Sequence, residues 1–214
     1  MTNLPRLHHQ PIKLYRYPLS GHSHRVELFL SLLGLPVQLI DVDLAAGAQR
    51  VPAFLEMNPF GQVPVIQDGE LTLADSNAIL VYLASQYADE QWLPREPAGA
   101  AAVQRWLSVA AGLVAFGPAA ARLITVFQAP LNAEEVIARA NGLFAVMEKE
   151  LQKSAFLVGD TPTIADIANY SYIAHAPEGN ISLAPYPNIR HWLARIEALP
   201  GFVPMVKSSV GFAA

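Results

Sequence analysis

The stretch NPFGQVPVIQDGELTLADSNAILVYL at residues 58–83 decides the fold of this chain. It places Pro64 inside a strand-like run and follows it with Asp68-Gly69, a dipeptide typical of two-residue hairpin turns. Proline removes a ladder donor, so a trans Pro64 fits only an edge strand, and proline statistics alone favour that arrangement. A cis Val63-Pro64 bond is the alternative, and it would leave the Val63 N–H and C=O free to pair with an extended peptide.

The same stretch continues into a helix that starts at Asp75-Ser76. Ser76 is a good N-cap residue, and capping alone explains its presence. A helix start also offers free N–H groups and a positive dipole end that suit a carboxylate. Because Asp75 would attract an ammonium group beside that carboxylate, the pair also suits the zwitterionic head of an amino acid.

Outward from this stretch, the first part of the chain alternates strands and helices. The patterns predict strands over 12–17, 37–44, 63–67 and 70–74, with helices over 26–33, 52–57 and 77–87. The first three elements form a β-α-β unit, whose strands are parallel. The predicted order is βαβ-α-ββα, an α/β domain over residues 12–88 that follows a flexible arm over 1–11.

The second part of the chain is predicted to be helical. Residues 89–99 are polar and contain prolines, as a linker does. Alanine-rich helical patterns follow, and they predict an all-α domain over residues 100–214 with helices over 100–127, 133–152, 163–175 and 188–199. The first of these helices contains Gly117-Pro118, where a bend is expected.

Composition excludes several classes of function. Of 214 residues, 52% are hydrophobic and 15% charged, which is ample for a packed core, and the net charge of -4 makes nucleic acid a poor partner. The start has no apolar signal segment, and we expect no membrane span, so a cytoplasmic location is predicted. There is no cysteine, so any thiol chemistry must use the sulfur of a ligand.

Two further positions carry polar groups of interest. Ser20 follows the first strand at its carboxyl end, where ligands bind in open α/β sheets, although it or Ser23 also suits a helix cap. Thr163 and Asp166 have the spacing of a capping box, so Asp166 is assigned to folding rather than catalysis. Tyr172 follows at helical spacing and is expected in the core with Ile164, Ile167 and Ala168.

Three segments together resemble one family: LYRYPLSGHSHRVELFLSLLGLP at 14–36, the stretch 58–83, and FLVGDTPTIADIANY at 156–170. In order and spacing they are similar to the cytosolic glutathione S-transferases, of the bacterial theta-like or nu-like, serine-dependent kind. The resemblance covers about residues 12–202. It implies a thioredoxin-like N-terminal domain, a helical C-terminal domain, glutathione as co-substrate, no metal and a homodimer.

The resemblance also implies roles for individual residues. Ser20 would hydrogen-bond the glutathione sulfur and favour its thiolate. His22 replaces an asparagine or proline of several relatives; it is interpreted as a loop histidine, with assistance to the thiolate as the alternative. The residues implied to bind glutathione are Gln49, Arg50, Gln62, Val63, Pro64, Asp75 and Ser76. Phe116, Arg122 and His175 are candidates for the acceptor pocket between the domains.

The resulting expectation is an enzyme that conjugates the thiolate of glutathione to small hydrophobic electrophiles by alkyl or aryl transfer. A glutathione-dependent disulfide or peroxide reductase is a second possibility, since it needs no cysteine of its own. A non-catalytic binding protein built on the same fold is a third. The physiological electrophile cannot be read from the sequence.

Overall fold

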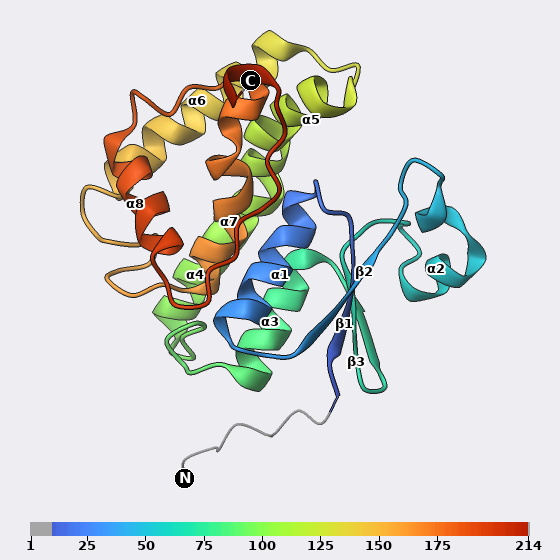
Figure 1. The fold of residues 1–214 in the computed structure, drawn as a ribbon. Helices are drawn as coiled ribbons and strands as arrows, with labels where there is room; N and C mark the ends of the chain where they lie inside the picture. Colours follow the sequence, from blue (N-terminus) through green and yellow to red (C-terminus); the bar gives the residue numbers. More distant parts are fainter. Residues whose placement is uncertain (1–9, 214) are drawn as a thin grey trace.

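The computed structural model describes residues 10–213, so most of the arm predicted over 1–11 lies outside the described residues. Figure 1 shows a small sheet with helices on one side of the molecule and a larger group of helices on the other. This arrangement confirms the predicted α/β domain followed by an all-α domain.

The N-terminal domain is built on a four-stranded sheet of order β2-β1-β3-β4. β1 and β2 are parallel, with Ile12 opposite Val37, whereas β3 runs antiparallel to both β1 and β4. The elements in chain order are β1 (Ile12–Arg16), α1 (Gly21–Leu32), β2 (Val37–Asp41), η1 (Ala48–Arg50), α2 (Pro52–Met57), β3 (Val65–Asp68), β4 (Leu71–Ala74) and α3 (Ser76–Tyr87). The predicted order βαβ-α-ββα is thus confirmed.

One boundary differs in a way that matters for function. The apolar pattern predicts the first helix over 26–33, but α1 begins at Gly21 because the Ser20 side chain accepts a hydrogen bond from the Ser23 N–H and caps it. The five additional residues are polar or small and carry no apolar signal. They bring His22 into the first turn of α1.

The C-terminal domain consists of helices, most of which follow the predicted spans within a few residues. They are α4 (Pro97–Val109), the π-helical segment η2 (Ala110–Ala119), α5 (Ala120–Phe127), α6 (Ala133–Glu150), α7 (Ile164–Ala174), η3 (Ala176–Gly179), α8 (Pro187–Glu197) and η4 (Gly211–Ala213). The helix predicted over 100–127 exists, and its π-helical middle contains Gly117-Pro118, where the bend is predicted.

The continuous helical run over 97–127 is long and apolar enough to cross a bilayer, with a mean hydropathy of 1.7. Length and composition alone therefore do not distinguish this run from a membrane helix, although Arg105 and Arg122 interrupt its apolar sequence. In the structure the run packs against α6 and α7 and supplies Val103, Leu107 and Val114 to the core. Core helices of globular proteins have the same composition, because one side must be apolar to be buried.

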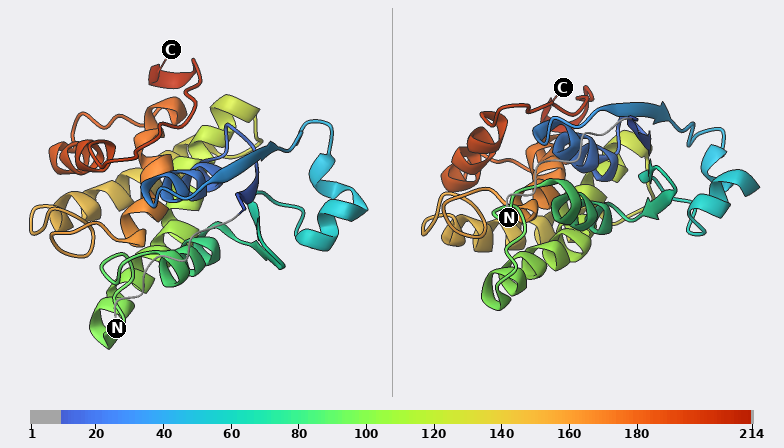
Figure 2. Two further views of the ribbon diagram at one scale, coloured as in Figure 1. Left: turned by 60° about the horizontal axis from the view of Figure 1, so that its bottom comes forward. Right: turned by 90° about the horizontal axis from the view of Figure 1, so that it is seen from below.

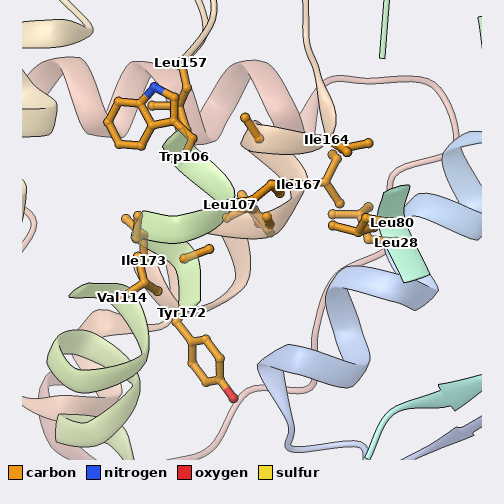
Figure 3. Close-up of a cluster of buried hydrophobic side chains, with 14 of the residues drawn as sticks. Leu28, Leu80, Trp106, Leu107, Val114, Leu157, Ile164, Ile167, Tyr172 and Ile173 are labelled. Atoms are coloured by element: carbon orange, nitrogen blue, oxygen red, sulfur yellow. The ribbon is translucent and has the colours of Figure 1, made fainter. Parts of the chain in front are cut away.

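One hydrophobic core joins the two domains. α1 and α3 lie between the sheet and the helical domain, where they pack against α7, whereas α2 lies apart at the outer end of the sheet (Figures 1 and 2). Figure 3 shows Leu28 of α1 and Leu80 of α3 meeting Leu107, Ile164 and Ile167 of the helical domain. Any site at the start of α1 is thus built on a rigid base.

The C-terminal segment strengthens this connection. After α8 the chain runs back past α7 and α1 (Figure 1). Ser31 of α1 donates a hydrogen bond to the Gly201 carbonyl oxygen at 2.6 Å, and the His24 Nε2 atom lies 2.9 Å from the Val203 carbonyl oxygen. Further on, Ser208 donates to both carboxylate oxygens of Glu178. The last described residues therefore clamp the helical domain onto α1.

Candidate active site

The Val63-Pro64 peptide bond is cis, which is the alternative that proline statistics alone disfavour. Within residues 10–213 neither the N–H nor the C=O of Val63 has a hydrogen-bond partner. Val63 lies just before β3, and its side chain is half-buried. Its backbone therefore presents one donor and one acceptor that an extended peptide can pair with.

The start of α3 differs from the expected cap. Asp75, not Ser76, is the N-cap, because its Oδ1 atom accepts hydrogen bonds of 2.9 Å from the N–H groups of Asn77 and Ala78. Ser76 is the first residue of the helix and its N–H makes no hydrogen bond within the described residues. Asp75 has a φ of +71°, a conformation that is costly for a residue with a side chain.

Arg25 of α1 lies beneath this helix start and was not recognised in the sequence. Its side chain is only 1% exposed, and its NH1 group donates to Ser76 Oγ at 3.2 Å and to Asn77 Oδ1 at 2.9 Å. None of the described carboxylates forms a salt bridge with it, and its Nε atom has no partner. Burial lowers the pKa of Arg25 to about 10, so it is still charged at neutral pH.

Ser20 and His22 lie at the start of α1, close to Ser76. His22 is part of the helix, so its interpretation as a loop histidine is wrong. Its Nδ1 atom is 3.4 Å from Ser76 Oγ. Burial, with a smaller contribution from the charge of Arg25, lowers the pKa of His22 to about 3. The ring is therefore neutral at physiological pH and adds no positive charge to the site.

Tyr172 reaches the same point from α7. Its side chain is 7% exposed and belongs to the core, as predicted, but its phenol ring packs on the backbone at Gly21. Its hydroxyl end therefore lies at the start of α1, where the Ser20 side chain and the His22 N–H both influence the pKa of the phenol. Helical spacing indicates burial but cannot show where the polar end of a buried tyrosine points.

The remaining predicted glutathione-binding residues lie near the loop before Val63. Gln49 is in η1, and its Oε1 atom is buried with no hydrogen-bond partner. Arg50 and Gln62 have exposed side chains. The Gln62 carbonyl oxygen is held by Asn58 Nδ2 at 2.8 Å. This region thus presents the Arg50 charge and the Gln62 side chain to solvent, whereas the amide oxygen of Gln49 is buried.

The three predicted acceptor residues do not line one pocket. Arg122 and His175 are buried and both pair with Glu178, at 2.5 Å and 2.7 Å, so they present no free side chain to a pocket. Phe116 is 60% exposed and lines a hollow on the outer face of η2 with Leu113 and Arg139.

A different pair of side chains lies beside the segment that leads to Ser20. The ring of Tyr17, after β1, lies 6.1 Å from that of Phe127 at the end of α5. Phe127 and the nearby Leu123 are each 42% exposed. Sequence spacing gave no signal for this pair, because the two rings come from different domains. Among the described residues no group of three His, Asp or Glu side chains is placed to hold a metal ion.

Comparison with known proteins gives the family. Residues 10–85 match the family model described as glutathione S-transferase, N-terminal domain, and residues 110–200 match the glutathione S-transferase, C-terminal domain. This chain belongs to the glutathione S-transferase family. Proteins of this family use glutathione as co-substrate, and Ser20, Arg25, Val63, Asp75 and Ser76 lie within the N-terminal match.

Individual relatives cover nearly the whole transferase chain. Glutathione S-transferase 3 of Zea mays is 36% identical over 90% of this chain and 91% of its own length. The disulfide-bond oxidoreductase YfcG of Escherichia coli K12 is 33% identical over 88% of this chain and 91% of its own length. The crystal structure of a glutathione S-transferase from Pseudomonas fluorescens Pf-5 has a TM-score of 0.87 at 34% identity, covering 92% of this chain and 100% of that one.

Proposed function

We propose that this chain is a serine-dependent glutathione transferase that joins the thiolate of glutathione to small hydrophobic electrophiles. The observation that carries the proposal is Arg25, a buried cation bonded to Ser76 and unpaired by any described carboxylate. Asp75 attracts Arg25 without forming a salt bridge with it, and a buried charge that is not directly paired is costly. The carboxylate of the γ-glutamyl group at the start of α3 would supply a directly bonded negative charge.

The other groups around Arg25 fit the rest of the tripeptide. Asp75 uses Oδ1 to cap α3, which leaves Oδ2 for the γ-glutamyl ammonium group. The free N–H and C=O of Val63 suit the backbone of the cysteinyl residue. Arg50, Gln49 and Gln62 then suit the glycyl carboxylate end.

Ser20 is the residue proposed to act on the sulfur. A thiol has a pKa near ~8.5, and a hydrogen bond donated to the thiolate favours the charged form. The dipole of α1 adds a further attraction for negative charge at its N-terminus. The thiolate attacks the electrophilic carbon, forms the carbon–sulfur bond and expels the leaving group.

The acceptor is proposed to bind beside Tyr17, Leu123 and Phe127 rather than at the positions first considered. These side chains lie next to the segment that carries Ser20 and are partly exposed and apolar. An apolar surface beside a charged nucleophile favours hydrophobic electrophiles. A cytoplasmic location and a homodimer remain expectations.

Isothermal titration calorimetry with glutathione tests the proposal, with Asp75→Asn as the matched variant. Wild-type protein is expected to bind glutathione. Asp75→Asn keeps a capping oxygen but loses the charge that attracts the ammonium group, so its affinity is expected to fall about tenfold. Absence of binding by the wild type refutes the proposal.

The second candidate function is glutathione-dependent disulfide reduction. It is favoured by the similarity to the disulfide-bond oxidoreductase of Escherichia coli and is compatible with a chain that has no cysteine. In that reaction the bound thiolate attacks a disulfide sulfur instead of carbon. Comparing turnover of a small aliphatic disulfide with turnover of an aryl halide separates the two functions.

A further inference from the structure

Tyr172 connects the helical domain to the residue proposed to act on the glutathione sulfur. The side chain leaves α7 within the hydrophobic core and is 7% exposed. In Figure 3 its ring extends away from the labelled aliphatic side chains, with the phenol oxygen at the outer end. A buried phenol needs a hydrogen-bond partner, and the start of α1 provides it.

The position of the ring is fixed by Gly21, which lies between Ser20 and His22. A Cβ atom at Gly21 would be 2.8 Å from both Cε1 and Cζ of Tyr172 and 2.9 Å from Cε2. These are the atoms at the hydroxyl end of the ring, so that end lies directly on the helix start. The His22 ring meets the phenol ring edge-on at 5.0 Å, which fixes its tilt.

At this position the phenol oxygen lies close enough to the Ser20 side chain and the His22 N–H for both to influence its pKa. Burial raises the pKa of Tyr172, while the nearby charges of Arg25 and Arg122 and these two groups lower it; the net shift is upward. Tyr172 is therefore a neutral hydroxyl at physiological pH. It can donate one hydrogen bond and accept others.

The hydroxyl of Ser20 has limited capacity. It has one O–H to donate and two lone pairs, and one lone pair already accepts from the Ser23 N–H at 3.2 Å. A thiolate is a charged acceptor and forms a stronger hydrogen bond than a neutral phenol does. When the Ser20 proton turns to a thiolate, the second lone pair of Ser20 becomes available to the Tyr172 proton.

We propose that Tyr172 is a positioning residue for Ser20: it donates to the Ser20 oxygen and so directs the Ser20 proton to the glutathione thiolate. The inference rests on the glutathione site proposed above. In this arrangement the Tyr172 oxygen would accept from the His22 N–H beside it, and the three groups would form a chain of hydrogen bonds that ends at the sulfur. Each bond in such a chain polarises the next.

The test is a pH titration of the thiolate absorbance of bound glutathione in wild type, Tyr172→Phe, Ser20→Ala and the double variant. Tyr172→Phe is expected to raise the pKa of the bound thiol by roughly half to one unit, the value of one neutral hydrogen bond. At neutral pH its kcat with an aryl halide is expected to fall roughly three- to tenfold, with little change in KM for glutathione.

The double variant separates positioning from a merely structural role. If Tyr172 acts through Ser20, adding Tyr172→Phe to Ser20→Ala changes the thiol pKa no further. Tyr170→Phe is the matched control, because Tyr170 lies on the same helix, is 4% exposed and donates to Glu197 instead. The glutathione thiol bound to Tyr170→Phe protein should have the same pKa as in the wild type.

The possible failures are distinguishable. If wild-type protein binds no glutathione, the proposed function falls and the role of Tyr172 falls with it. If the wild type binds and ionises glutathione but Tyr172→Phe titrates identically, only the role of Tyr172 is refuted. If Tyr172→Phe raises the pKa of the bound thiol by the same amount in the Ser20→Ala background, the proposed role of Tyr172 is also refuted, because the phenol would then act without Ser20.

Discussion

Arg122 on α5 donates a hydrogen bond of 2.7 Å to the carbonyl oxygen of Leu19, the residue immediately before Ser20. The two residues are 103 positions apart in the chain. The same guanidinium pairs with Glu178 at 2.5 Å, and Glu178 in turn binds His175 and Ser208. The loop that presents Ser20 is therefore held by a buried ion pair of the helical domain.

Replacing Arg122 should damage both stability and the presentation of Ser20. Arg122→Met leaves Glu178 buried without its cation, and we expect a loss of about 3–5 kcal/mol in the free energy of unfolding, measured by urea denaturation. Arg139→Met is the control, because the Arg139–Glu135 pair is exposed and should contribute less than ~1 kcal/mol. Equal stabilities of the two variants would contradict the prediction.

Asp166 should be essential for folding and not for glutathione binding. Its carboxylate accepts hydrogen bonds from the Leu157 and Thr163 N–H groups and from Trp192 Nε1. Asp166→Asn turns an NH₂ group toward these donors, so we expect a loss of roughly 3 kcal/mol in thermal or urea unfolding. Glutathione affinity of the folded protein, measured by calorimetry, should be unchanged.

Asp160→Asn provides the comparison for that substitution. Asp160 is exposed and accepts only a long hydrogen bond of 3.4 Å from the Ala155 N–H. Its replacement should change the free energy of unfolding by less than ~0.5 kcal/mol. A weakened affinity for glutathione in folded Asp166→Asn protein would show that the capping box also shapes the site.

Stability should fall as the pH drops below about 6.5. Burial lowers the pKa of His24 to about 4 in the folded protein, against an ordinary value of 6.5. Between these values the unfolded state binds more protons, so stability present above pH 6.5 is lost progressively toward pH 4, by up to about 3 kcal/mol for this residue. Urea unfolding at a series of pH values measures the slope.

His24→Gln tests the assignment of that slope. Glutamine does not titrate, so the free energy of unfolding of the variant should change less between pH 6.5 and 4 than that of the wild type. At pH 7 the variant should be less stable than the wild type, because the contacts of His24 to Ser171 and Val203 are disturbed. His22, whose pKa is lowered to about 3 by burial, contributes in the same direction. Parallel profiles for the variant and the wild type would exclude His24 as the source.

Phe127→Ala should weaken binding of the acceptor and spare glutathione. The side chain is 42% exposed and contacts Tyr17, next to the loop that carries Ser20. Its removal is expected to raise KM for an aryl halide roughly five- to tenfold with unchanged KM for glutathione, as measured by steady-state kinetics. Phe116→Ala is the control, because that ring lies in the hollow beside Arg139. A larger effect in Phe116→Ala would return the acceptor site to the original candidates.

Local signals account for the features that the sequence predicts well. The Asp68-Gly69 hairpin and the capping box of Asp166 each depend on neighbours within a few residues, whereas local signals leave both a cis and a trans Val63-Pro64 bond open. The order of strands and helices follows from periodicity over short windows. The residues that interact are close together in the chain, so these features can be predicted from a single sequence.

The rest of the candidate site depends on distant pairs. Arg25 meets Ser76 across 51 positions, and Tyr172 meets the start of α1 from another domain. Asp75 rather than Ser76 caps α3, and it does so with a positive φ that its residue type does not predict. A buried arginine and a buried tyrosine both look like ordinary helix residues until the fold brings their polar ends together.

The contacts of the C-terminal segment with α1 affect whether the N-terminal domain can be transferred to another protein by itself. The thioredoxin-like domain supplies most of the proposed glutathione contacts. Two of its α1 residues, however, are bonded to the C-terminal segment: Ser31 to Gly201 and His24 to Val203. Transferring residues 10–88 alone to another protein would expose to solvent the faces of α1 and α3 that pack against α7, and would remove the C-terminal segment that bonds to α1. The unit that can be exchanged between proteins is the whole two-domain chain.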